Sequence, residues 1–448
     1  MNTEALTEKV GKREVLALAW PAILEMSLHM LAWIVDTAMV GRLGAAALSA
    51  VGLGGQVYFS LAFFLGAVGV GATALVARHK GARDTSGASH VAEQGLFLGL
   101  VFGALMTAIL LPNARRLYDL VGLGSEVGSL GTAYVRTASL GALFFLPTMV
   151  ANGIMRGMGD TRTPLYVTLV TNIVNIVGDY LLIYGHLGLP RMGVAGAALA
   201  LLAGQVVGGL LALWALFRRA DPPIRLAGVL RPRVASLRRI LSLSIPAGME
   251  TVLMDGARTV STFIIASMGT VSMAAHQVAI TAESLSFMPG YGFAIAASII
   301  TGQSLGAGKP RRAEEGTRQS WLLGLMTMSA MGLVFFLFPR QLVALFTVDR
   351  EVIDLAARCL QIAAVMQPAI ATTEVFTGAL RGAGDTRTAM YVTALGSWAV
   401  RVPLIVVAVY VLHLSLVTVW LAMVAEWTVR ALLVRWVFTR GRWRALQV

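Results

Sequence analysis

Cysteine is nearly missing from this sequence of 448 residues, which contains a single one, Cys359. A lone thiol excludes a disulfide framework within the chain and a cysteine-rich metal site. No His-Glu-x-x-His zinc motif, phosphate-binding P-loop or other ATPase signature occurs in the sequence. We therefore expect neither a bound cofactor nor ATP-driven work by this chain alone.

Charged residues are also scarce. They make up 13% of the sequence, against about 25% in soluble domains, while 57% is hydrophobic and the mean hydropathy is +0.74. A net charge of +13 could suggest a nucleic-acid partner, but the basic residues lie between long apolar stretches. We therefore expect a membrane protein with no nucleic-acid partner.

The sequence is instead rich in long apolar segments. A helix needs about 20 predominantly apolar residues to cross a bilayer. Twelve segments meet this length and predict an all-α polytopic membrane protein. They are residues 14–38, 51–77, 91–112, 129–154, 163–186, 192–217, 239–266, 276–303, 317–338, 353–379, 388–411 and 414–437.

The sequence repeats itself once at an offset of 225 residues. Residues 156–163 read Arg-Gly-Met-Gly-Asp-Thr-Arg-Thr, and residues 381–388 read Arg-Gly-Ala-Gly-Asp-Thr-Arg-Thr. The same offset relates Pro21 to Pro246. One offset over most of the chain indicates a duplicated unit. With six spans in each copy the two repeats are parallel, which predicts lobes at 1–217 and 239–448 joined by a linker at 218–238.

Basic residues predict the orientation. If the N-terminus lies inside, most lysines and arginines fall in the inner loops, the tails and the linker. The outer loops then hold only Arg42, Arg115, Arg116, Arg191, Arg340 and Arg350. Because inner loops are enriched in Lys and Arg, we expect both termini and the linker to be cytoplasmic.

Two carboxylates in the first half are candidates for ion coupling. A charge inside a membrane span is energetically costly, so each such residue is expected to have a functional or structural role. Asp36 lies in the outer half of the first span, and Asn175 and Asp179 share one face of the fifth span at a similar depth. The second repeat has Ser261 and Leu404 instead of these aspartates. The pattern predicts a proton or cation site; a helix cap for Asp36 and an interfacial place for Asp179 are the structural alternatives.

The second half carries its own intramembrane charges. Asp255 and Glu426 each have an arginine at helical spacing, so mutual neutralisation is an equal reading for them. Glu374 and Arg401 have no local partner and favour a cavity role. Glu250 lies four residues after a proline, where it could serve the kink or a cavity. Glu250, Asp255, Glu374 and Arg401 are therefore the candidate cavity residues of the second lobe.

Together these segments resemble the multidrug and toxic compound extrusion (MATE) family over nearly the whole chain. The segments that carry the resemblance are 35–44, the paired motifs at 156–162 and 381–387, 274–277, and the DinF-like runs 286–293 and 302–303. The resemblance implies two six-helix lobes in a V and export of amphipathic or cationic drugs by alternating access. It places the proton-linked aspartate on Asp36, its partners on Asn175 and Asp179, and the hinge proline on Pro21.

The resemblance leaves the coupling ion open between H⁺ and Na⁺. Leu201 stands where relatives often have a threonine proposed to bind sodium, and the acidic positions of a second sodium site fall on Met254 and Ile370. We therefore favour proton coupling over sodium at Asp36, Asn175 and Asp179.

Competing functions are a sodium-coupled exporter, a flippase for lipids or lipid-linked sugars, and an intramembrane enzyme, for which no nucleophile–base or metal constellation is found. The expected partners are the lipid bilayer and small organic cations or amphipathic drugs. The expected location is the plasma (inner) membrane of a bacterium, with the protein taken as a monomer.

Overall fold

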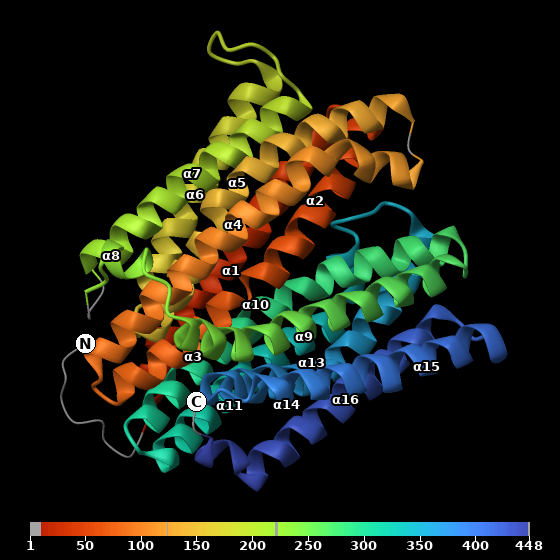
Figure 1. The fold of residues 1–448 in the computed structure, drawn as a ribbon. Helices are drawn as coiled ribbons and strands as arrows, with labels where there is room; N and C mark the ends of the chain where they lie inside the picture. The colour runs from red at the N-terminus through yellow and green to blue at the C-terminus, as the bar shows by residue number, and fades with distance from the viewer. Residues whose placement is uncertain (1–9, 123, 220–222, 447–448) are drawn as a thin grey trace. The chain divides into compact units, whose positions relative to one another are not determined.

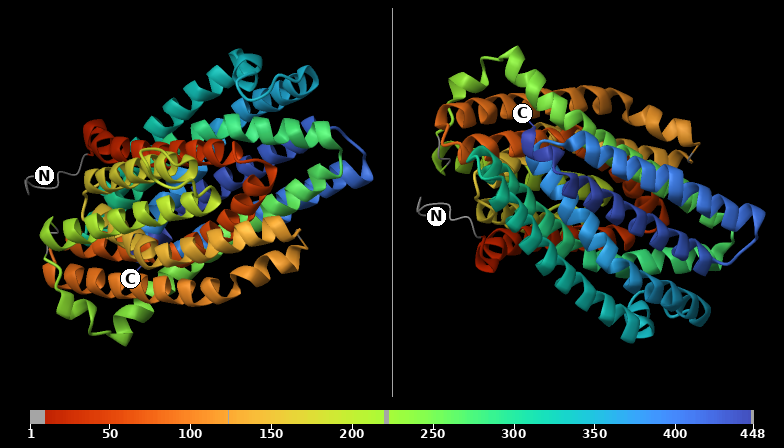
Figure 2. Two further views of the ribbon diagram at one scale, coloured as in Figure 1. Left: turned by 90° about the horizontal axis from the view of Figure 1, so that it is seen from above. Right: turned by 90° about the horizontal axis from the view of Figure 1, so that it is seen from below.

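The computed structural model describes residues 10–122, 124–219 and 223–446, and within these residues the chain is helical with no β-strand. Figure 1 shows the helices in chain order, and Figure 2 shows them from two further sides. The prediction of an all-α polytopic protein is confirmed. The predicted linker at 218–238 is described except for residues 220–222.

Helix packing divides the chain into two compact units, 24–248 and 1–23 with 249–448. The first unit holds most of α1 (Lys12–Gly41) and the start of α9 (Val234–Ala266). Between them in sequence are α2 (Ala45–Gly66), α3 (Val68–Gly81), α4 (Thr85–Val121), α5 (Ser125–Gly157), α6 (Arg162–Tyr184), α7 (Val194–Arg219) and α8 (Leu226–Val229). Within this unit α4 lies beside α5, and α6 lies beside α7.

The second unit holds the start of α1 and the rest of α9. The elements that follow α9 are α10 (Thr270–Gly306), α11 (Pro310–Leu337), α12 (Pro339–Val343), α13 (Arg350–Ala383), α14 (Thr386–Ala394), α15 (Val402–Val406) and α16 (Leu416–Arg440). Here α13 is central, with α10, α11 and α16 packed against it. Val15 and Leu18 of α1 join the core of this unit.

Each division between the units falls just after a proline inside a long helix. In α1 the boundary follows Ile23, two residues after Pro21, and in α9 it follows Gly248, two residues after Pro246. The two boundaries are related by the same offset of 225 residues as the sequence repeat. The lobe limits read from the sequence, 1–217 and 239–448, stay predictions, because packing assigns the first turns of α1 and α9 differently.

Eleven helical segments of the described chain are long and apolar enough to cross a membrane. The predicted seventh span lies on α9, a 33-residue helix that is not among these eleven. Glu250, Asp255 and Arg258 lower its apolar content.

Two predicted spans differ from the structure in detail. The second is interrupted at Ala67, where α2 ends and α3 begins. The eleventh contains wide π-helical turns at Leu395–Arg401 and Val407–Val411 on either side of α15. Single π-helical turns are frequent at functional sites, and the first of these ends on Arg401.

Candidate functional site

Polar contacts hold the C-terminal part of α1 against α6. Asn172 Nδ2 donates to the Leu28 carbonyl oxygen at 2.8 Å, and the Tyr184 hydroxyl donates to the Met39 carbonyl oxygen at 3.0 Å. The spacing of these pairs along both helices is similar, so the two helices run parallel. Every side chain of this contact line comes from the unit 24–248.

Between those two contacts the carboxyl groups of Asp36 and Asp179 lie within hydrogen-bonding reach of each other. Asp179 is fully buried, and its Oδ2 accepts from Asn175 Nδ2 at 3.2 Å. Its Oδ1 meets no N–H or O–H donor in the described part of the chain. The structure therefore brings together Asp36, Asn175 and Asp179 in one cluster on α1 and α6.

Two carboxylates accept hydrogen bonds but cannot donate one. The contact between Asp36 and Asp179 is therefore a hydrogen bond only when one of them carries a proton. Two like charges at this range in an apolar setting also disfavour double ionisation. Chemically, the cluster can hold one proton between the two carboxylates.

A buried tyrosine lies near this cluster, and a second buried tyrosine pairs with a glutamine in the same unit; the sequence analysis missed these residues. Tyr134 of α5 is buried and close enough to interact electrostatically with both aspartates. The Tyr58 hydroxyl donates to Gln205 Oε1 at 3.2 Å, and Gln205 Nε2 has no partner among the described residues. These residues are scattered over α2, α5 and α7, and no sequence motif links them.

Glu25 and Glu250, which follow Pro21 and Pro246 by four residues, form ion pairs with arginines of the duplicated motif. Glu25 is fully buried, and its Oε1 lies 3.0 Å from Arg156 Nη2. Glu250 repeats this contact, with its Oε2 at 2.9 Å from Arg381 Nη2. The arginines are the first residues of the duplicated motif. Each motif therefore neutralises the glutamate that follows a helix proline by four residues, and the two partners of each ion pair lie in the same unit.

The aspartate of each motif begins the next helix. Asp160 Oδ1 accepts from the backbone N–H groups of Arg162 and Thr163 at 3.0 Å, and Asp385 Oδ1 accepts from Thr388 N at 3.2 Å. Such caps satisfy the free N–H groups of a helix start. The motif therefore combines an ion pair with a helix cap in each repeat.

A second polar network is buried in the unit that contains α13. Glu250 Oε1 accepts from Thr393 Oγ1 at 2.9 Å, and Thr393 Oγ1 accepts from Arg430 Nη2 at 3.0 Å. Arg430 Nη1 lies 3.3 Å from Glu426 Oε1, which confirms the intrahelical pair expected on α16. Glu426 Oε2 lies 3.5 Å from Arg401 Nη1. The chain of contacts thus joins the candidates Glu250 and Arg401.

The other two candidates of this lobe behave differently. Glu374 is buried and close enough to interact electrostatically with Arg381, Arg430 and Glu250, so it belongs beside the network. Asp255 lies apart from it, with Oδ1 3.9 Å from Arg258 Nη1 and both side chains substantially exposed. This geometry fits the structural alternative for Asp255, in which Arg258 of the same helix neutralises its charge.

Comparison with known proteins now bears on these sites. The MatE family model matches residues 21–181 and again residues 246–407, one match to each repeat. The chain belongs to the MATE family. Its relatives include a probable multidrug resistance protein NorM from Thermotoga maritima, 33% identical over 433 residues that cover 96% of this chain and 93% of the relative. A NorM of Pseudomonas aeruginosa is 30% identical and covers 90% and 83%.

Solved MATE structures have the same fold. An outward-facing multidrug resistance MATE transporter superposes with a TM-score of 0.90, 27% identity and coverage of 98% and 97%. A transporter of the wider MOP superfamily from Pyrococcus furiosus gives a TM-score of 0.91, 26% identity and 99% coverage of both chains. This MATE chain is therefore a multi-pass membrane transporter with the family's two-lobe helical fold.

Proposed function

We propose that this MATE transporter is a secondary exporter that exchanges protons for amphipathic or cationic organic compounds by alternating access. The observation that carries the proposal is the contact between Asp36 and Asp179. The relatives named as multidrug resistance proteins support the substrate class. The transporter works in the inner membrane of a bacterium, with both termini inside.

The proton changes what holds α1 to α6. With one proton bound, Asp36 and Asp179 share a hydrogen bond between the contacts at Leu28 and Met39. Without it, two negative charges repel across the same contact. Proton release therefore loosens α1 beyond Pro21, where the proline removes a backbone hydrogen bond and weakens the helix. Bending there reshapes the space available to a substrate.

Sodium is the alternative coupling ion, and the ligand set disfavours it. Na⁺ prefers several oxygen ligands, and Leu201, Met254 and Ile370 stand where the family resemblance would place oxygen-bearing side chains of sodium sites. A proton needs no such cage, so this site fits H⁺ better.

Transport in proteoliposomes tests the proposal. The purified protein is reconstituted, and export of a fluorescent organic cation is followed after imposing a pH gradient, a sodium gradient or neither. We expect accumulation with the pH gradient and none with sodium alone. Accumulation driven only by sodium would overturn proton coupling. A failure to transport a panel of organic cations, tested in the same way, would overturn the substrate class.

A further inference from the structure

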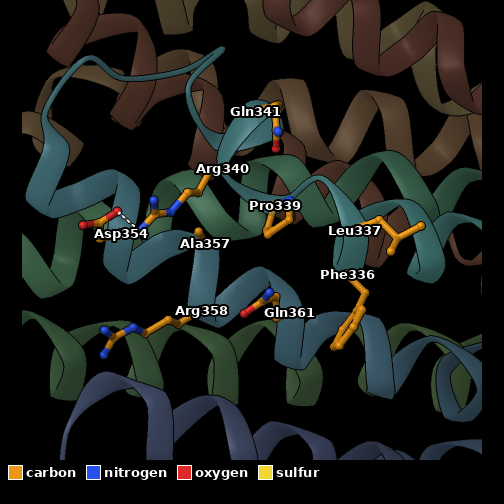
Figure 3. Close-up of a pocket in the computed structure, with 9 residues that line it drawn as sticks. All are labelled: Phe336, Leu337, Pro339, Arg340, Gln341, Asp354, Ala357, Arg358 and Gln361. Carbon is orange, nitrogen blue, oxygen red and sulfur yellow. Dashed lines mark ion pairs between the residues drawn. The ribbon is translucent and has the colours of Figure 1, made fainter.

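A pocket with a volume of about 420 Å³ lies between the end of α11, α12 and the first turns of α13. Its polar side chains are Arg340 and Gln341 of α12 and Asp354, Arg358 and Gln361 of α13, and its apolar wall is Phe336, Leu337, Pro339 and Ala357. Figure 3 shows Arg340 reaching from α12 to Asp354. None of its lining residues belongs to either polar network.

The charges of this pocket do not balance. Arg340 Nη2 lies 2.9 Å from Asp354 Oδ1, so these two neutralise each other. Arg358, one helical turn beyond Asp354 on the same face of α13, has no ion-pair or hydrogen-bond partner in the described part of the chain. One arginine is therefore left uncompensated, and the pocket has room for one negative charge.

Arg358 lies near one end of a helix that is long and apolar enough to cross a membrane, eight residues after Arg350, which is about 12 Å along the helix axis. Because the 34 residues of α13 are longer than the roughly 30 Å hydrocarbon core, this position is expected near the boundary with the lipid headgroups. An exposed guanidinium there extends towards the headgroups and is stabilised by an anionic partner. The phosphates of the lipid headgroups are the anions available there.

The surroundings of the pocket are apolar on the surface. Phe336, Leu337 and Phe338 at the end of α11 are each about half exposed, and Leu345 and Val348 before α13 are more exposed still. A free phosphate gains nothing from such a rim, whereas acyl chains do. Arginine also binds phosphate oxygens in a bidentate manner.

We propose that the α11–α13 pocket binds one anionic phospholipid, with its phosphodiester against Arg358 and its acyl chains along Phe336 and Leu337. Under the predicted topology this lipid belongs to the outer leaflet. A headgroup without a positive charge, such as phosphatidylglycerol, matches the single uncompensated arginine. The ammonium of a zwitterionic lipid would instead add a third cation beside Arg340 and Arg358.

Native mass spectrometry of the delipidated full chain tests this assignment. The protein in mild detergent is titrated with phosphatidylglycerol and, separately, with phosphatidylethanolamine of the same acyl chains. Arg358→Gln should weaken the tightest phosphatidylglycerol binding about tenfold, the size expected for losing a hydrogen bond to a charged group. Arg358→Lys, which keeps the charge, should weaken it less.

Arg115→Gln is the matched control. It removes an exposed arginine from the other unit, where Arg115 is paired with Asp119 at 3.0 Å, and should leave the tightest site unchanged. Equal affinity for the two lipids, unchanged binding in a folded Arg358→Gln protein, or an equal loss in Arg115→Gln would each overturn the proposal. Displacement of the lipid by millimolar glycerophosphoglycerol would assign the pocket to a soluble phosphodiester and would also contradict it.

Discussion

Arg156 Nη2 lies 3.0 Å from Glu25 Oε1, and this ion pair joins the duplicated motif to the helix turn after Pro21. Glu25 is fully buried, whereas Arg156 is one-fifth exposed at its side chain. Removing one partner of a buried pair leaves an uncompensated charge and costs about 3–5 kcal/mol. The pair therefore contributes to the stability of the first unit.

Arg156→Met should consequently destabilise the protein by several kcal/mol, seen as a lower midpoint of thermal unfolding in detergent. The double variant Glu25→Gln with Arg156→Met removes both charges and should recover most of the loss. Arg115→Met, in an exposed pair, should change stability by less than about 1 kcal/mol. A double variant as unstable as Arg156→Met would contradict the electrostatic explanation.

A second prediction concerns the linker after α7. Gln94 of α4 donates through Nε2 to the carbonyl oxygens of Gly228 and Arg231 at 3.1 Å, and its Oε1 accepts from Arg233 N at 2.7 Å. Gln94→Leu removes all three hydrogen bonds and should expose the linker to trypsin at its arginines. The same substitution at the exposed Gln56 serves as the control. Unchanged cleavage rates in inverted vesicles would show that Gln94 does not hold the linker.

The linker also shows where sequence reasoning ends. Its arginines, the repeat and the apolar spans depend on residue type and spacing, so the fold class and the family resemblance could be predicted. Contacts between distant segments could not: Gln94 precedes Arg233 by 139 residues, and Glu25 precedes Arg156 by 131. The recurrence of that second separation between Glu250 and Arg381 was a usable signal.

The same limit applies to the candidate site. Asp36, Asn175 and Asp179 stand out because charged and amide groups are rare in apolar helices, so sequence identifies them. Tyr134 and Gln205 do not stand out, because tyrosine and glutamine occur in spans for many reasons. Only the packing of the helices places Tyr134 of α5 near the carboxylates and Gln205 of α7 against Tyr58.

Topology is the third prediction. The distribution of basic residues predicts that both termini and the linker are cytoplasmic. A reporter enzyme that is active only outside the cytoplasm, fused at the C-terminus or in the linker, should give no activity. The same reporter in the outer loop near Arg191 should be active. Activity at the C-terminus would invert the orientation and with it the leaflet assigned to the lipid pocket.

Movement of α1 is the fourth prediction. Spin labels at Trp33 and Leu120, both exposed and both in the unit 24–248, report the distance between the outer part of α1 and the end of α4. Proton release should change this distance, because repulsion between Asp36 and Asp179 weakens the contact of α1 with α6. The change should disappear in Asp36→Asn. A distance that stays constant over the titration of an active protein would exclude this mechanism.

The central claim is that the Asp36–Asp179 pair carries the proton that drives export, and transport by Asp36→Asn tests it most directly. Asparagine fills the same volume and can donate a hydrogen bond to Asp179 but cannot release a proton. The variant in proteoliposomes should bind a fluorescent organic cation with near-normal affinity, while accumulation driven by a pH gradient is lost. Asp119→Asn, at an exposed carboxylate, should transport normally. Normal gradient-driven accumulation by Asp36→Asn would contradict the account.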